Sequence, residues 1–533
     1  MYEPSTARDD DAPTMLVRDA VFELLRNLGI TTIFGNPGST ELPFLKNMPA
    51  DFRYILGLQE VVAMGMADGF AQGTGNAALV NLHSAAGLGH ALGNMFTAWK
   101  NHTPIIVTAG QQARSLLQLD PFLFAQTPTE FPRPYVKWAC EPARAQDVPA
   151  ALMRAYAIAM QPPRGPVFVS IPIDDWEQTT TPVNARDITQ ARGAAPDAIA
   201  RLGERIEAAT RPVIVAGDDI SRDGAMDALI TLAERINAPV WAAPMSGRCN
   251  FPETHRLFAG FLPAAREPIV KELTGQDLVL ALGAPVFTYH IEGSGPMLPP
   301  GADLIQLINN PDIAAWAQVG SSVVTDLRLA LEALLARPAP TTPRPVPPPR
   351  RAPPPLPGTA GISDKLFFQT LARLRPADAI IVEEAPSARP AMHDYLPIEH
   401  ADGFFAGASG GLGHGLPAAI GMAMARPDRK VIAVIGDGSA MYAIQALWTA
   451  SHLKLPLTVI ILKNGNYEAL MRFGRLFGMQ NVPGAHFPDL DFRALATGQS
   501  CEALRVEGPD QLEDTLRAAL AAKFPTLVEI IID

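Results

Sequence analysis

Two apolar segments in the last third of the chain constrain its fold most strongly. Residues 431–436 (VIAVIG) and 457–463 (LTVIILK) are β-branched runs that end abruptly at Asp437 and Asn464, each beside a glycine. A helix-like stretch from about 441 to 453 separates them, so the segment is predicted to be strand–helix–strand. Because such crossovers are right-handed and their strands parallel, both polar residues should lie at one carboxyl edge of a sheet. Open α/β sheets bind ligands at that edge.

The residue types at this edge suit a divalent cation. Asp437 offers a carboxylate and Asn464 an amide oxygen, and Gly436 and Gly438 allow a close approach to the backbone. Oxygen ligands of this kind hold Mg²⁺ together with phosphate groups. A solvated turn followed by an asparagine turn is the alternative, and Gly-Asp-Gly alone does not exclude it.

Length and charge narrow the class of protein. A chain of 533 residues is too long for one core, and three domains are expected. Its formal net charge of -11, with no basic patch among aromatics, predicts that it does not bind nucleic acid. Although nearly half of the residues are hydrophobic, no uncharged run has the length of a membrane span, so no membrane contact is expected.

The cysteines and the first residues predict a cytoplasmic protein. Cys140, Cys249 and Cys501 lie far apart without metal-type spacing, as is common in a reducing compartment. Residues 1–11 are acidic and lack an apolar signal core.

Strand-like runs alternate with helical stretches in three regions, which predicts three doubly wound parallel-sheet α/β domains. The runs are continuous in Val, Ile and Leu rather than alternating, as in strands that are covered on both faces. The expected strands are residues 31–34, 54–56, 78–82, 104–108, 167–171, 212–216, 239–242, 278–282, 303–307, 379–382, 431–436, 457–463 and 526–531. The predicted domains are 12–182, 195–336 and 358–533.

A proline-rich segment separates the second and third domains. More than half of residues 337–357 are proline, so this segment should form neither a helix nor a central strand. We expect an extended, semi-rigid linker; an SH3-type ligand is the alternative.

Three polar residues of the first domain lie just past predicted strands. Ser39 belongs to the glycine-rich turn 35–41 (GNPGSTE), Glu60 follows the run 54–59 and His83 follows the run 78–82. Taken singly, each has an ordinary structural explanation, such as a helix cap for Glu60. Together they should converge on one edge of the sheet.

The Asp437 and Asn464 motif resembles the diphosphate-binding motif of thiamin diphosphate (ThDP) enzymes. The likeness extends over residues 34–176, 284–290, 410–420 and 437–484, where the chain resembles the benzoylformate decarboxylases of the ThDP-dependent 2-oxo acid decarboxylase and acetolactate synthase family. The resemblance implies three domains: pyrimidine-binding, middle and diphosphate-binding. Lys463 departs from it, since the family usually has a second asparagine there.

The resemblance implies ThDP and Mg²⁺ as cofactors. Asp437, Asn464 and the backbone carbonyl of Asn466 would hold the metal. Leu412 would wedge between the cofactor rings, with ordinary core packing as the alternative, and the Gly410 carbonyl would accept from the 4′-amino group. The diphosphate would be held by Ser387, Gly436, Gly438, Ser439 and Tyr467. The middle domain lacks a convincing GxGxxG fingerprint, so no FAD is expected.

The same resemblance assigns the catalytic roles. Glu60 would activate the cofactor's pyrimidine ring and Ser39 would hydrogen-bond the substrate carboxylate. His83 would orient or protonate the carbonyl oxygen, and His290 would serve the later proton transfer and aldehyde release.

Several positions that line the family's substrate pocket differ in this chain. Ala406 and Ala485 stand where larger side chains are usual, and Pro386 and Arg389 replace small hydroxyl residues. The lost volume should open space for a ring substituent, and Arg389 would add a polar partner unless it points to solvent or to a surface acid. The apolar lining is kept at Phe122, Leu123, Ala469, Leu470 and Phe473.

The expected function is ThDP- and Mg²⁺-dependent decarboxylation of an aromatic 2-oxo acid to an aldehyde and CO₂. The site should lie between the first domain of one subunit and the third of another, so the expected assembly is at least a homodimer, with a tetramer favoured. One alternative is a carboligase of acetolactate-synthase type, which product analysis would distinguish. A non-catalytic cofactor-binding homologue is the other, and a turnover assay would decide. The substrate, the pathway and nucleotide binding by the middle domain stay open.

Overall fold

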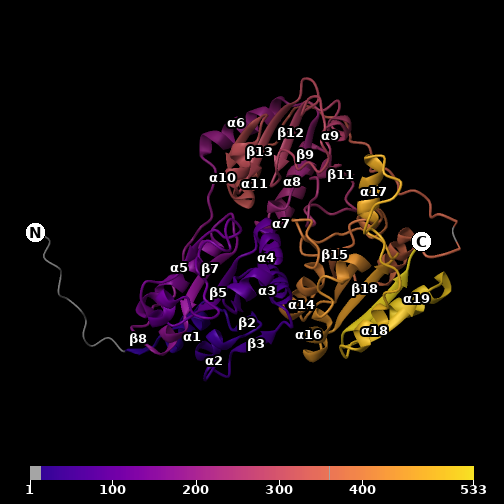
Figure 1. Ribbon diagram of the computed structural model, residues 1–533. Helices are drawn as coiled ribbons and strands as arrows, with labels where there is room; N and C mark the ends of the chain where they lie inside the picture. The colour runs from indigo at the N-terminus through magenta and orange to yellow at the C-terminus, as the bar shows by residue number, and fades with distance from the viewer. Residues whose placement is uncertain (1–13, 359) are drawn as a thin grey trace, which may run out of the picture. The chain divides into compact units, whose positions relative to one another are not determined.

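The computed structural model describes residues 14–358 and 360–533, and contains three six-stranded sheets (Figure 1). The chain divides into two compact units, the first being residues 1–189 with 420–425 and the second residues 190–419 with 426–533. The acidic start and residues 12 and 13 of the predicted first domain lie outside the described residues. Within the described residues, every strand pair of the three sheets is parallel, which confirms the predicted fold class.

The first unit holds the sheet of order β3-β2-β4-β5-β7-β6. Its strands are β2 (Thr32–Gly35), β3 (Arg53–Leu56), β4 (Ala78–Leu82), β5 (Ile105–Gln111), β6 (Ala139–Cys140) and β7 (Val167–Pro172). A two-stranded antiparallel ribbon joins β1 (Met15–Leu16) to β8 (Thr179–Thr180).

Helices cover both faces of this sheet. Val21 and Leu25 of α1 share a buried cluster with strand residues such as Ile33 and Leu79, because their spacing puts them on one helical face. The α-helices are α1 (Val17–Asn27), α2 (Leu42–Leu45), α3 (Glu60–Thr74), α4 (Ser84–Asn101) and α5 (Val148–Met160). The 3₁₀ helices are η1 (Ser39–Glu41), η2 (Arg114–Leu119), η3 (Ala145–Asp147) and η4 (Ile173–Glu177).

The second unit holds two sheets, the first of which has the order β11-β10-β9-β12-β13-β14. Its strands are β9 (Pro212–Ala216), β10 (Val240–Ala242), β11 (Phe258–Phe261), β12 (Leu278–Leu282), β13 (Asp303–Ile308) and β14 (Ser321–Val324). Its helices are α6 (Pro196–Ala208), α7 (Asp219–Arg222), α8 (Met226–Ile236), α9 (Arg266–Glu272), α10 (Pro311–Trp316) and α11 (Leu327–Leu335).

The other sheet of the second unit has the order β16-β15-β17-β18-β20-β19. Its strands are β15 (Ile380–Glu384), β16 (Phe404–Ala406), β17 (Val431–Gly436), β18 (Leu457–Lys463), β19 (Glu502–Val506) and β20 (Thr526–Ile531). The helices are α12 (Asp364–Leu374), α13 (Arg389–Tyr395), α14 (Gly415–Ala425), α15 (Asp437–Ala440), α16 (Ala446–His452), α17 (Glu468–Leu476), α18 (Phe492–Thr497) and α19 (Pro509–Ala521). One buried cluster joins both sheets, including Leu229 near the first and Ile381 in the second.

The helix predicted from about 441 to 453 is shorter than expected. The chain forms α15 directly after β17, then turns, and the longer helix α16 begins only at Ala446. The short helix places Asp437 at the strand end itself.

The proline-rich segment 337–357 has neither helix nor strand, but it is not a free spacer. Arg344 donates to the backbone oxygens of Ile206 (2.5 Å) and Ala209 (3.2 Å), and Asn237 donates to the oxygen of Pro345 (2.9 Å). Further along, Arg350 donates to the oxygen of His393 (3.0 Å). These bonds fix an extended chain along the second unit.

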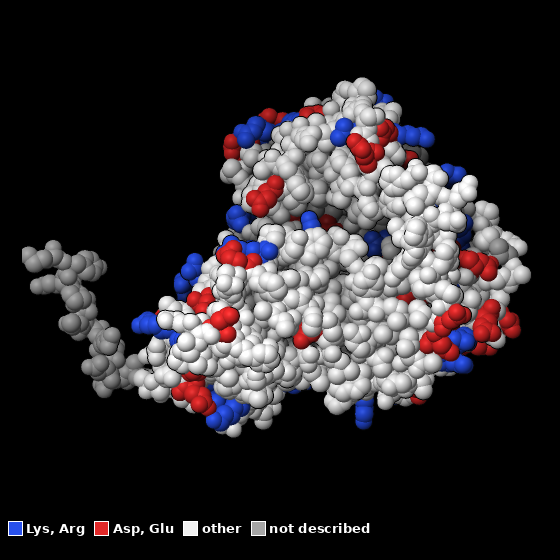
Figure 2. Space-filling model, in the orientation of Figure 1, with Lys and Arg blue, Asp and Glu red and all other residues white. Residues whose placement is uncertain are grey.

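Among the described residues, no helix is long and apolar enough to cross a membrane. On the face drawn in Figure 2, basic and acidic side chains are interspersed. The expectation that the chain binds no nucleic acid stays a prediction.

Candidate active site

Asp437 lies at the carboxyl edge of the sheet of β17 and β18, where the crossover argument predicts it. Its Oδ2 atom accepts from the backbone N–H groups of Asn464 (2.9 Å) and Gly465 (2.7 Å), and Oδ1 accepts from that of Gly438 (2.8 Å). The residue is 3% exposed, and burial raises the pKa of its carboxyl above the usual range. A cation placed here would offset the cost of burying the charge.

Asn464 and Asn466 form the turn that follows β18. The Oδ1 atom of Asn464 accepts from the backbone N–H of Asn466 (2.9 Å), and Asn466 returns a side-chain bond to the Asn464 backbone oxygen (2.7 Å). His486 pairs with the Asn466 side chain. The described residues hold no group of three or more His, Cys, Asp or Glu suited to a metal, so a cation here would depend on Asp437 with amide and backbone oxygens. This donor set fits Mg²⁺ shared with a diphosphate.

Gly438 and Tyr467 face each other across this edge. A methyl group at Gly438 would overlap the Tyr467 ring, so glycine is required there. The Tyr467 ring packs on Phe487 at 4.7 Å between centroids, and Ser439 is buried beside Gly438. Ser387 is partly buried, and its backbone oxygen accepts from Arg472 (3.1 Å).

A glycine-rich turn that carries Gly410 and Leu412 precedes α14. Gly410 and Gly413 have φ of 71° and 92°, a conformation that side chains other than glycine rarely adopt. A methyl group at Gly413 would come 2.7 Å from the Tyr442 Cβ atom. Leu412 is partly exposed. Its contact with the cofactor rings stays a prediction, with ordinary core packing as the alternative.

Glu384, the last residue of β15, holds the end of this turn. Its carboxylate accepts from the backbone N–H groups of Gly413 (2.7 Å), His414 (2.8 Å) and Gly415. Burial raises the pKa of the Glu384 carboxyl, an effect that these N–H groups oppose.

Lys463, the last residue of β18, pairs with an acid of β20. Its ammonium group pairs with the fully buried carboxylate of Glu529 on β20 (3.0 Å) and donates to the backbone oxygen of Leu490. Arg505 binds the other oxygen of Glu529 (2.8 Å). Lysine at this position thus balances a buried acid of the sheet, and its charge also opposes the rise in the pKa of the Asp437 carboxyl.

In the first unit, His83 is bound to a buried carboxylate. Its Nδ1 atom lies 2.9 Å from Oε2 of Glu41 and 3.0 Å from Oγ1 of Thr40. Glu41 also accepts from Thr40 (2.5 Å) and from the backbone N–H groups of Gly38 (2.9 Å) and Gly110 (3.0 Å). The ring is therefore fixed through one nitrogen, which leaves Nε2 for a ligand.

Glu60 begins α3 and lies near His83. Its oxygens accept from Asn36 Nδ2 (3.3 Å) and pair with Nδ1 of His90 (3.1 Å), and the residue is 7% exposed. A methyl group at Gly87 would lie 3.3 Å from Oε1 of Glu60 and 3.5 Å from Cβ of His83, so the two residues flank this glycine. Ser39 is exposed at the start of η1.

The structure brings some predicted pocket residues of the second unit together. The ring of His290 packs on Phe473 of α17, with 4.7 Å between centroids. Leu470, on the same helix, is exposed, and Ala469 is partly buried.

Ala406 and Ala485 are both buried. Ala406 ends β16 and its backbone N–H donates to the Gly247 oxygen (2.9 Å); the Ala485 oxygen accepts from the Tyr467 N–H (2.8 Å). Ala485 therefore lies beside a predicted cofactor residue.

Arg389 points neither to solvent nor to a surface acid. Its Nε atom donates to Oε2 of Glu383 (2.5 Å), whose side chain is fully buried in β15. Glu383 also accepts from the Ala385 N–H, so the pair fixes the segment around exposed Pro386.

In the first unit, Phe122 and Leu123 lie on an irregular loop. Phe122 is 86% exposed, and its backbone oxygen accepts from Gln112 (2.8 Å). Leu123 has a φ of 65° and accepts from the Ser84 hydroxyl (2.6 Å).

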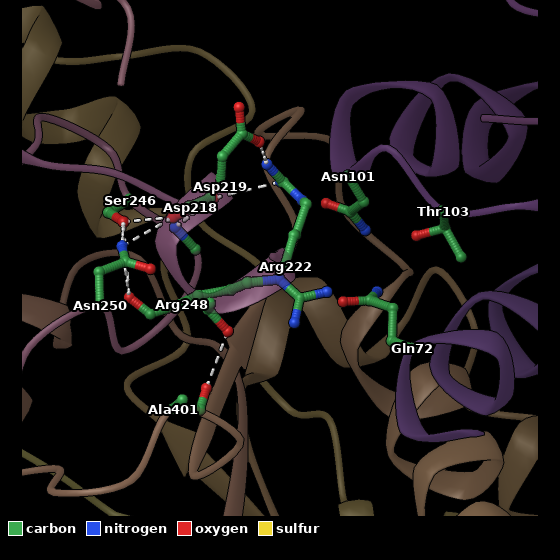
Figure 3. Close-up of polar contacts among 12 residues, drawn as sticks. Gln72, Asn101, Thr103, Asp218, Asp219, Arg222, Ser246, Arg248, Asn250 and Ala401 are labelled. Atoms are coloured by element: carbon green, nitrogen blue, oxygen red, sulfur yellow. Dashed lines mark hydrogen bonds and ion pairs between the residues drawn. The ribbon is translucent and has the colours of Figure 1, made fainter. Parts of the chain in front are cut away.

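The edge past β9 of the second unit carries acids. Figure 3 shows Asp218 bonded to Ser246 and to Asn250 (3.2 Å), and Asp219 bonded to Arg222 (2.9 Å). Gly217 packs so tightly on Gly283 that a methyl group would overlap the backbone there. Carboxylates and a closed turn do not fit a pyrophosphate, which needs exposed N–H groups. The absence of FAD stays a prediction.

Four side chains that make hydrogen bonds or ion pairs near the candidate site residues were not predicted from the sequence to do so. They are Glu41, His90, Glu383 and Glu384. Two consecutive acids that end a buried strand, as in 383–384, were the available signal, because charges are seldom buried without partners.

Comparison with known proteins identifies the family. Residues 15–130, 199–334 and 387–530 match the N-terminal TPP binding domain, the central domain and the C-terminal TPP binding domain of thiamine pyrophosphate enzymes. The chain is 46% identical over 519 residues to benzoylformate decarboxylase of Pseudomonas aeruginosa, covering 96% of this chain and 98% of that protein.

Solved structures of benzoylformate decarboxylases share the fold of this chain over nearly its whole length. The 4-hydroxybenzoylformate decarboxylase of Rhodococcus jostii has a TM-score of 0.95 at 41% identity, covering 97% of this chain and 99% of that chain. The benzoylformate decarboxylase of Polynucleobacter necessarius has a TM-score of 0.93 at 40% identity, covering 97% and 98%. The chain therefore belongs to the benzoylformate decarboxylases, a family of ThDP-dependent 2-oxo acid decarboxylases.

Proposed function

We propose that this chain converts an aromatic 2-oxo acid of the benzoylformate type into its aldehyde and CO₂, with Mg²⁺ beside ThDP. The observation that carries the proposal is the bond between His83 and the buried Glu41 carboxylate. It holds the imidazole in one orientation, as a residue that passes a proton to substrate requires.

The metal is proposed to be held by Asp437, Asn464 and the Asn466 backbone carbonyl. The buried Asp437 carboxylate, already bonded to three backbone N–H groups, supports this assignment because it carries a charge that a cation would balance. We assign the diphosphate to donors at Ser387, Gly436, Gly438, Ser439 and Tyr467.

Glu60 is proposed to share a proton with the cofactor's pyrimidine ring. When bound, ThDP accepts the electron pair that remains as the substrate carboxylate leaves as CO₂. The contacts of Glu60 with Asn36 and His90 support this role, because they hold the carboxyl group in place at the start of α3. Leu412 and the Gly410 carbonyl are proposed to fix the cofactor's shape.

Three polar side chains are proposed to act on the substrate. Ser39 would bind the carboxylate, and His83 would donate to the carbonyl oxygen. His290, exposed beside Phe473, would serve the later proton transfer that frees the aldehyde.

The pair of proton donors, His83 and His290, favours decarboxylation over the alternative, a carboligase of acetolactate-synthase type, because rapid protonation precedes capture by a second carbonyl compound. Membership in a decarboxylase family disfavours a non-catalytic homologue.

The substrate is proposed to carry a ring substituent. Alanine at 406 and 485 leaves more room than the larger side chains usual there, with Phe122, Leu123, Ala469, Leu470 and Phe473 as apolar lining. The Rhodococcus relative acts on 4-hydroxybenzoylformate, which supports this class. Since Arg389 is tied to Glu383, we propose that it forms a fixed wall beside Pro386 and does not reach for a distal acid.

The assembly is proposed to be a homodimer or homotetramer in which two chains complete each site. The domain limits 12–182, 195–336 and 358–533, the linker 337–357 and a cytoplasmic location also stay predictions.

Glu60→Gln should lower kcat for benzoylformate by roughly two to four powers of ten while the fold is kept, because the amide cannot exchange the required proton. The assay measures aldehyde release with ThDP and Mg²⁺ added. Glu177→Gln, an exposed acid of the same unit, is the control and should retain native turnover. Near-native activity of the Glu60 variant in a well-assembled oligomer would refute the assignment.

Asp437→Ala should abolish retention of both Mg²⁺ and ThDP, because the diphosphate loses its counter-ion in a buried site. Isothermal titration with both ligands should detect no binding at concentrations that saturate the native chain. Asp428→Ala, an exposed acid just before β17, should bind normally. Unchanged affinity in the Asp437 variant means that the metal lies elsewhere.

Ala406→Phe should shift the preference from para-substituted analogues toward benzoylformate. A side chain in an apolar pocket is worth about 1–3 kcal/mol of discrimination, so the ratio of kcat/KM values should change by roughly 10- to 200-fold. Ala521→Phe, exposed at the end of α19, should leave the ratio as it is. An unchanged ranking in the Ala406 variant excludes this position from the pocket.

A further inference from the structure

Glu383 and Glu384 are both buried, and their carboxylates bind different kinds of partner. Glu383 pairs with Arg389, whereas the Glu384 carboxylate binds three consecutive backbone N–H groups, those of Gly413, His414 and Gly415. Successive strand residues point to opposite faces, which explains why the two acids serve different segments. Glu384 has a relative exposure of only 7%, so its carboxylate has little contact with water. The bonds from these N–H groups offset the cost of burying its charge.

The N–H group of Gly415 begins α14, and those of Gly413 and His414 lie in the turn just before it. The first N–H groups of a helix have no partner within it, and the positive end of the helix dipole favours a carboxylate there. Glu384 therefore fixes where α14 begins and where the turn before it ends.

Glycine makes this contact possible. A methyl group at Gly415 would come 2.7 Å from Cβ of Glu384 and 3.0 Å from Cδ1 of Ile435, so only glycine lets the carboxylate approach. At the other end of the turn, the Gly411 N–H donates to the Ser409 hydroxyl (2.9 Å). The segment between them, which carries Gly410 and Leu412, is thus held at both ends.

We infer that Glu384 is a positioning residue that acts through the N–H groups of residues 413–415 to hold Leu412 and the Gly410 carbonyl against the cofactor. This inference rests on the proposed function, which gives those two residues their contact with ThDP. Glu384 itself reaches the cofactor only through the turn.

The test compares Glu384→Gln with the native chain. The glutamine side chain has an NH₂ group in place of one carboxylate oxygen. This group cannot accept from a backbone N–H, so at least one of the three bonds is lost. Amide hydrogen exchange of residues 410–415 in the cofactor-free chain should become about tenfold faster or more, since each bond to a charged group is worth over 1.4 kcal/mol. With ThDP and Mg²⁺, kcat should fall by about 100-fold, the cost expected for a displacement of about 1 Å, while KM changes by less than about threefold.

Glu253→Gln is the matched control. Glu253 is also a buried carboxylate of the second unit, but it pairs with His393 and does not contact the turn. Its variant should leave exchange at 410–415, ThDP affinity and kcat as in the native chain. If Glu384→Gln fails to fold, Glu384→Asp keeps the charge but retracts it by one methylene, and the same local rise in exchange and loss of kcat is expected.

The outcomes separate this inference from the proposed function. A native chain that neither binds ThDP nor releases aldehyde overturns the proposed function. A native chain that does both, with a Glu384 variant of native exchange, affinity and kcat, overturns the positioning role alone. The positioning role is also overturned if Glu384→Gln lowers the stability of the whole chain but leaves kcat and exchange at 410–415 as they are in Glu253→Gln.

Discussion

Buried carboxylates bonded to backbone N–H groups hold the loops that carry the proposed site residues. Glu41 binds the N–H groups of Gly38 and Gly110, Glu384 binds those of residues 413–415, and Asp437 binds those of Gly438, Asn464 and Gly465. A buried carboxylate without such partners would cost several kcal/mol. Each acid and its loop therefore stabilise each other.

The same interaction has a different consequence at each place. At Glu41, the Oε2 atom that accepts from the Gly38 N–H group also binds Nδ1 of His83, and at Asp437 the carboxylate carries a charge suited to a cation. At Glu384 it determines the turn before α14. At the edge past β9, the acids Asp218 and Asp219 bind Ser246 and Arg222, and Gly217 packs against Gly283.

The sequence predicts the central strands well because a strand buried on both faces has a continuous apolar run. Five edge strands were not predicted, since an edge strand can be short and is covered less completely than a central one: β6, β11, β14, β16 and β19. The strand-end positions of Asp437 and Asn464 follow from local pattern and crossover handedness. The roles of Glu384 and Lys463 do not, because their partners, the turn 413–415 and Glu529, come from distant segments. These contacts form only when distant segments fold together, so a local sequence pattern does not reveal them.

Product analysis of Glu41→Gln determines whether this buried carboxylate positions the proton donor His83. Native chain and variant are given benzoylformate, ThDP, Mg²⁺ and a second aldehyde as acceptor, and the aldehyde and 2-hydroxy ketone products are quantified. We predict that the native chain releases mainly benzaldehyde, and that the variant turns over more slowly and forms a larger share of 2-hydroxy ketone, because His83 is no longer fixed for proton transfer. A native rate and a native product ratio in a folded Glu41→Gln protein would contradict the account.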